Sequence, residues 1–179
     1  DLTFAFVRGV ARVVGTMTGI YIDAHLDVRP EVGSGMPFRA LMEGGFATGL
    51  HCIGVNPLVT MHDHAEYFRG KGGTMHASPP ACETAALLDP DKPAFVSLDM
   101  DAFDSAYAPG VSAINPCGLS PREVGPIVRA AGRMASVKCF DIMELNPEHD
   151  VEGRTARLAA HMFLTFLRGL AERPEAGGV

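Results

Sequence analysis

Two short acidic clusters constrain the fold of this chain most strongly, because each directly follows an apolar, strand-like run. The first cluster is DAHLD at 23–27, after the run 17–22, and the second is DMD at 99–101, after the run that begins at Pro93. In an extended segment residues i, i+2 and i+4 point to the same side, so each cluster gathers its acids on one side. If the two runs are neighbours in a parallel sheet, five metal-ligand side chains meet at their carboxyl ends: Asp23, His25, Asp27, Asp99 and Asp101.

Four carboxylates in a small, partly dry site require cations, because burial and mutual repulsion both disfavour the charged forms. Two divalent ions would neutralise the four negative charges. A donor set rich in oxygen, with an imidazole, suits Mn²⁺, and a two-metal site of this kind is typical of a hydrolytic enzyme. The structural alternative is that each aspartate caps the turn after its strand.

The composition narrows the class of protein and its partners. The chain has 179 residues, is 47% hydrophobic and carries a formal net charge of −6. This acidity argues against nucleic acid or an anionic membrane surface as a partner and leaves a small molecule as the substrate. The four cysteines form no C-x-x-C pair, and two of them lie in apolar runs, which indicates a reducing, cytoplasmic location.

Strand-like runs alternate with helical patterns along the chain, which predicts an α/β fold with a mainly parallel sheet. The predicted strands are 17–22, 50–55, 94–99 and 136–142. The predicted helices are 3–14, 36–45, 62–69, 81–88, 121–133 and 154–170. The helix at 121–133 has the clearest start, with Ser120 as N-cap, Pro121 in the first turn and Glu123 three residues after the cap.

Three stretches resemble the arginase/agmatinase/formimidoylglutamase family of binuclear manganese hydrolases. They are DAHLD at 23–27, SLDMDAFDSAYAPG at 97–110 and ELNPEHD at 144–150. The resemblance implies a three-layer α/β/α fold that binds two Mn²⁺ ions. It also implies that residues 1–179 form a single arginase-like catalytic domain, and the abrupt start at Asp1 leads us to expect that its N-terminal part is missing.

Within that family the chain looks most like the formimidoylglutamase branch, through VRP at 28–30 and SGMPFRAL at 34–41. The activity implied is hydrolysis of N-formimidoyl-L-glutamate to L-glutamate and formamide, in histidine degradation. The same resemblance leaves a guanidine hydrolase of the agmatinase, guanidinobutyrase or arginase type open, which would release urea instead. It leaves a homo-oligomer open as well.

The resemblance also implies a role for each matching acid. Asp23, Asp27 and Asp99 match metal ligands, with Asp23 and Asp99 bridging both ions, and His25 and Asp101 match ligands of the second ion. Asp101 is in addition our candidate for passing a proton to the leaving amine.

Four residues are our candidates for binding the substrate. Glu144 matches the family glutamate that pairs with the amidine cation, and the fork of Arg39 suits the carboxylate of a glutamate moiety. Ser34 stands where arginases have a proton-shuttling histidine, and Asn56 lies in a segment that lacks the acid arginases use near the substrate amino group. Both departures favour a substrate other than arginine.

One departure bears on the metal itself. Family members carry a further histidine ligand just upstream of the first helix, and that residue is absent from this sequence. A metal-deficient, non-catalytic module is therefore the remaining alternative.

Overall fold

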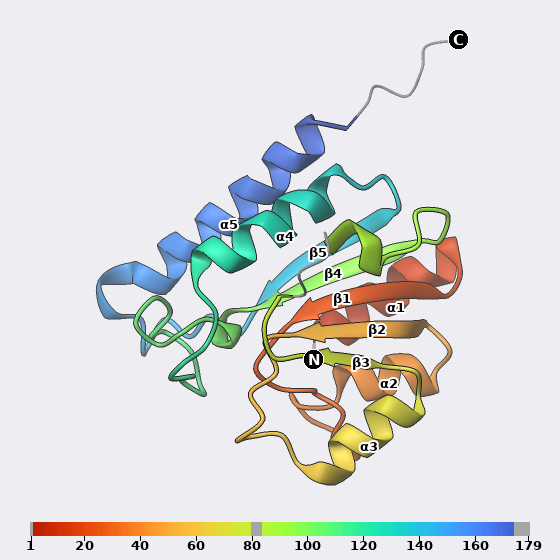
Figure 1. The fold of residues 1–179 in the computed structure, drawn as a ribbon, viewed down its shortest axis with the longest axis horizontal. Helices are drawn as coiled ribbons and strands as arrows, with labels where there is room; N and C mark the ends of the chain where they lie inside the picture. The colour runs from red at the N-terminus through yellow and green to blue at the C-terminus, as the bar shows by residue number, and fades with distance from the viewer. Residues whose placement is uncertain (1, 80–83, 174–179) are drawn as a thin grey trace.

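The computed structural model describes residues 2–79 and 84–173, which form a parallel sheet between two layers of helices (Figure 1). The strands are β1 (Met17–Ile22), β2 (Ala47–Ile53), β3 (Thr74–His76), β4 (Ala94–Asp99) and β5 (Val137–Met143). The helices are α1 (Leu2–Val14), α2 (Pro37–Glu43), α3 (His62–Gly70), α4 (Pro121–Arg133) and α5 (Arg154–Ala171), with 3-10 turns η1 (Thr84–Leu87), η2 (Met100–Ala102) and η3 (Val151–Gly153). The predicted three-layer α/β/α architecture is confirmed.

The core lies on both faces of the sheet, and β1 shows how the sequence builds it. Ile20 and Ile22 pack in the cluster that also contains residues of α4 and α5, whereas Met17 and Tyr21 pack with residues of α1, α2 and α3. Figure 1 shows α4 and α5 together over one face of the sheet. Burial on both faces is characteristic of parallel sheets and explains why the central strands read as nearly continuous apolar runs.

The order of the strands determines where a site can form. The sheet runs β3-β2-β1-β4-β5, and every pairing in it is parallel. The chain moves from β1 to one edge and then returns to place β4 on the other side of β1. Such a switch in direction opens a crevice at the carboxyl ends of the two strands. The last pair between them is Ile22 with Leu98, so segments 23–27 and 99–101 leave the sheet side by side.

The start of α4 is as predicted. The Glu123 carboxylate accepts hydrogen bonds from the Ser120 backbone N–H at 2.8 Å and from the Ser120 hydroxyl at 2.7 Å. This capping box satisfies donors that the first turn of a helix otherwise leaves unpaired.

Three elements differ from the prediction. Strand β2 begins three residues before the predicted 50–55 and ends two residues earlier than predicted, at Ile53, before Gly54, which has a φ of 98°. Of the helix predicted at 81–88, residues 81–83 lie outside the described part of the chain, and residues 84–87 form only the 3-10 turn η1. Pro90 and Pro93 follow closely, and the residue before a proline avoids the helical region. Strand β3 was not predicted, because it has three residues and pairs only with the end of β2.

None of the helices in the described ranges combines the length and the apolar character needed to span a membrane.

Candidate metal centre

The candidate site lies at the carboxyl ends of β1 and β4, where the two acidic clusters leave the sheet. The first acid of each cluster fixes the turn that follows it. Asp23 Oδ1 accepts a hydrogen bond from the His25 N–H at 2.6 Å, and Asp99 Oδ1 accepts one from the Asp101 N–H at 2.9 Å. The capping role predicted by the structural alternative is therefore present. It occupies one oxygen of each carboxylate.

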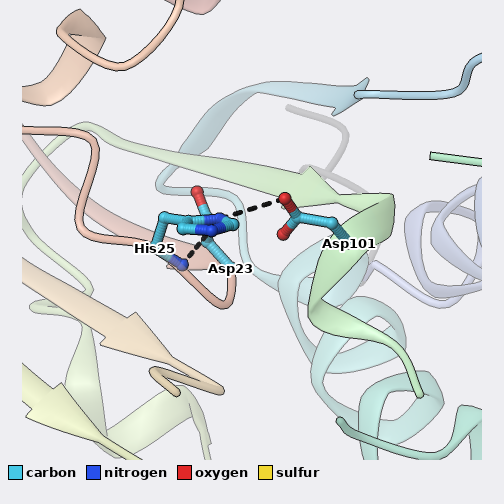
Figure 2. Close-up of side chains that lie close together, drawn as sticks. All are labelled: Asp23, His25 and Asp101. Atoms are coloured by element: carbon cyan, nitrogen blue, oxygen red, sulfur yellow. Dashed lines mark hydrogen bonds and ion pairs between the residues drawn. The ribbon is translucent and has the colours of Figure 1, made fainter. Parts of the chain in front are cut away.

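Three of the predicted ligands meet directly across the two loops. His25 Nδ1 lies 3.0 Å from Asp101 Oδ2 and 3.5 Å from Asp23 Oδ1 (Figure 2). One ligand atom from each of these residues falls within 4.8 Å of the other two. Asp23 and Asp101 are 3% and 4% exposed, whereas the His25 side chain is 27% exposed and forms the side of the group that faces solvent.

The remaining predicted acids line two small cavities beside this group. A cavity of about 160 Å³ is bordered by His25, Asp27, Asp99, Asp101 and Glu144. A second one of about 40 Å³ lies towards α1, and Asp23, Asp27, Asp99 and Glu144 border it. The structure thus brings the five predicted ligands and Glu144 to one place. Ser34 lines both cavities as well.

The backbone is strained at two of these acids. Asp27 has a φ of 48° and Glu144 a φ of 63°, in the left-handed region that non-glycine residues seldom adopt. Such conformations cost roughly 1–3 kcal/mol each and concentrate at functional sites. Here both of the strained residues contribute a carboxylate to the cavities, which is consistent with a functional constraint on their direction.

Burial and mutual repulsion shift the protonation of the cluster. Burial raises the pKa of Asp23 and of Asp99 well above the usual range, and the neighbouring carboxylates add to both shifts. Burial likewise raises the pKa of Asp27 to about 6. Hydrogen bonds to Asp101 and Asp23 raise the pKa of His25 to about 10. The site therefore binds extra positive charge, either as protons or as metal ions.

Two predicted substrate-binding residues lie elsewhere. The Arg39 guanidinium pairs with Glu43 at 3.0 Å and stacks over the Tyr67 ring at 4.1 Å, and Arg39 is not among the residues that border the acidic cavities. Asn56 bonds to Asn115 and borders a different cavity. Their predicted contacts with substrate stay predictions, and the structure does not bring either side chain to the acids.

Arg29 borders the acidic cavity, and sequence reasoning did not identify it as a site residue. Its backbone N–H donates to the Gly35 carbonyl at 2.8 Å. A Cβ added at Gly35 would lie 2.8 Å from Arg29 Cδ, so the glycine makes room for the arginine. The only sequence signal for Arg29 was its position, two residues after the first acidic cluster.

Comparison with known proteins shows which family the chain resembles. The model of the arginase family matches residues 1–168. Formimidoylglutamase of Bacillus subtilis (strain 168) is 30% identical over 97% of this chain and 60% of the relative, and arginase 1 of Arabidopsis thaliana is 32% identical over 90% and 50%. The crystal structure of Trypanosoma cruzi formiminoglutamase in its Mn²⁺₂ form superposes with a TM-score of 0.86 at 32% identity, covering 96% of this chain and 63% of that one. The chain therefore spans little more than half the length of the relatives it matches.

We expect Asp27→Asn to stabilise the metal-free protein at neutral pH. The pKa of Asp27 is raised to about 6 in the folded state, so the folded state loses stability as pH rises from about 4 through 6. Asparagine removes that penalty and tolerates the left-handed backbone. In EDTA at pH 7.5 the variant should be more stable in urea than the wild type by about 1–3 kcal/mol, and the difference should vanish near pH 3.5.

Mn²⁺ should reverse the order, because the wild type gains a ligand that the variant has lost. The exposed Asp91→Asn change serves as the control and should show neither effect. A wild type that is more stable than Asp27→Asn in EDTA at pH 7.5 would contradict this electrostatic account.

Proposed function

The chain belongs to the arginase family, and we propose that the protein is a binuclear-metal hydrolase of a linear amidine. The substrate we propose is N-formimidoyl-L-glutamate, which water converts to L-glutamate and formamide. The observation that carries the proposal is the convergence of Asp23, His25 and Asp101 with further acids at the carboxyl ends of β1 and β4. Formimidoylglutamases among the matching relatives and structures support the choice of substrate.

The residues present fit Mn²⁺, and we propose two ions for the complete protein. Asp23, His25, Asp27, Asp99 and Asp101 would hold them, since these donors are oxygen-rich with one imidazole. Burial raises the pKa of Asp23 and of Asp99, so nearby positive charge would favour their ionised forms, which supports this assignment. When bound, such ions lower the pKa of water towards neutrality and so supply the nucleophile for hydrolysis.

The chain's own residues then bind and orient the substrate. The Glu144 carboxylate borders both acidic cavities and suits the planar N–C–N cation of an amidine, which it can pair with through two hydrogen bonds. In the pose that we propose, the formimidoyl carbon lies beside the acids of β1 and β4. Asp101 Oδ2 lies 3.0 Å from His25 Nδ1, and we assign to it the transfer of a proton: it takes the proton that the attacking water loses and gives it to the leaving nitrogen of glutamate as the carbon–nitrogen bond breaks.

The distal carboxylate of the substrate needs a cation, and we assign Arg29 to it in place of Arg39. Arg29 borders the acidic cavity, whereas the Arg39 guanidinium is already engaged by Glu43 and Tyr67. A planar guanidinium recognises a carboxylate through two parallel hydrogen bonds. An arginine at the mouth of the cavity would favour formimidoylglutamate over agmatine, which has no carboxylate.

The proposal extends to the setting of the enzyme. Histidine degradation is the process that supplies this substrate class, and we place the protein in the cytoplasm. Buried thiols at Cys52 and Cys139 are consistent with a reducing compartment.

Product analysis tests the proposed reaction. With Mn²⁺ present, we expect formamide and L-glutamate from N-formimidoyl-L-glutamate, at a kcat/KM well above that for release of urea from arginine or agmatine. Urea as the dominant product would favour the guanidine hydrolases. The similarity to arginase 1 of Arabidopsis thaliana supports this alternative. Loss of both activities, with no binding of Mn²⁺, would favour a non-catalytic module.

Kinetics of two arginine variants test the assignment of the substrate carboxylate. Arg29→Ala should raise KM for N-formimidoyl-L-glutamate more than it lowers kcat, because a contact remote from the reacting carbon binds ground state and transition state alike. Because Arg29 is exposed in the free protein, the loss should be about 1 kcal/mol. Arg39→Ala should raise KM less than Arg29→Ala does, and the opposite order would restore Arg39 to the role.

A further inference from the structure

Two asparagines join the loops that carry the predicted metal ligands, although neither borders the acidic cavities. The Asn56 Nδ2 donates to Asn115 Oδ1 at 3.0 Å. Asn115 is 4% exposed, and Asn56, after β2, is half-buried. Both line a separate cavity of about 380 Å³ that none of the predicted metal ligands borders.

Each asparagine also reaches the backbone of one ligand-bearing loop. The Asn56 N–H donates to the carbonyl of Ala24, between Asp23 and His25, at 2.9 Å. Asn115 Nδ2 donates to the carbonyl of Ala102, directly after Asp101, at 3.5 Å. The connection from Ala24 through the two asparagines to Ala102 therefore spans the gap between the loops.

This bridge differs from the other contacts between the loops in the atoms it uses. The Ala24 N–H reaches Asp101 Oδ1 at 3.4 Å, and His25 reaches Asp101 Oδ2 at 3.0 Å. Both contacts occupy carboxylate oxygens that bound ions would claim. The asparagine bridge uses the Asn56 backbone N–H, two backbone carbonyls and two side-chain amides, so none of its atoms belongs to a carboxylate that would bind an ion.

A bridge of this kind matters because the loops repel each other. Asp23 and Asp101 offer carboxylate oxygens within 4.8 Å of each other from opposite sides of the gap, and like charges at that distance repel. The regular pairing of β1 with β4 ends at Ile22 and Leu98, before the acids begin. Beyond that point the loops are joined by the contacts to the Asp101 carboxylate and by the neutral hydrogen bonds of the asparagine bridge.

We propose that Asn56 and Asn115 are positioning residues that set the spacing of the two ligand loops and thereby the affinity for metal. The inference rests on the proposed function, because it concerns the same metal centre. It gives Asn56 a role that acts through the loops, in place of the predicted contact with substrate. Groups that orient metal ligands typically contribute 10- to 100-fold to metal affinity.

The test is the Mn²⁺ dissociation constant of the tightest site, measured by electron paramagnetic resonance on protein shown to be folded by circular dichroism. Asn115→Ala and Asn56→Ala should each weaken binding about 10-fold or more. The double variant should be little worse than either single one, because both remove the same bridge. Leu58→Ala is the matched control, since this side chain lies in the same loop, borders the same cavity and is 93% exposed.

Each outcome separates the two proposals. A wild type that binds Mn²⁺, with asparagine variants that bind it equally well, would overturn the positioning role and leave the proposed function standing. A wild type that binds no Mn²⁺ would overturn both. If the buried Asn115→Ala change prevents folding, the half-buried Asn56→Ala decides alone, and additive losses in a folded double variant would also contradict the shared bridge.

Discussion

Repulsion between buried carboxylates at one edge of the sheet is the constraint on which the rest of this structure depends. Asp23, Asp99 and Asp101 are each less than 10% exposed, and neighbouring acids raise the pKa of the first two. A cluster of this kind makes the folding of a metal-free protein less favourable. Protonation of the acids, or a charged His25, offsets only part of this cost. Its presence in a small fold therefore points to cations as the intended occupants.

The order of the strands in the sheet brings these acids together. Placing β4 beside β1, rather than continuing beyond β3, sets the two acidic segments against each other at the switch in strand direction. Both strands are buried on both faces, so their ends have little freedom to move apart. In the loops, where regular pairing has stopped, the Asn56–Asn115 hydrogen bond and the left-handed backbone at Asp27 and Glu144 take the place of the sheet in determining the local geometry.

Much of this could be predicted from sequence because the signals were local. The apolar runs before Asp23 and Asp99, and the cap at Ser120, depend on near neighbours and were predicted at or within a residue of their observed positions. The bridge from Asn56 to Asn115 spans 59 positions, and no periodicity reveals such a pair. Arg39 was chosen for the geometry of its guanidinium, but Glu43, one helical turn later, competes for it. The position of the Arg29 side chain at the cavity depends on the space beside Gly35, and this contact is seen only in the folded structure.

The central claim is that the acids at the ends of β1 and β4 hold divalent ions. Crystals grown with Mn²⁺ and measured at the manganese absorption edge test it directly, because anomalous scattering locates the metal independently of the protein atoms. The account predicts anomalous peaks bordered by Asp23, His25, Asp99 and Asp101, with the Asp101–His25 hydrogen bond replaced by coordination. A well-ordered site with those side chains still paired to one another, and no anomalous peak between the two loops, would contradict it.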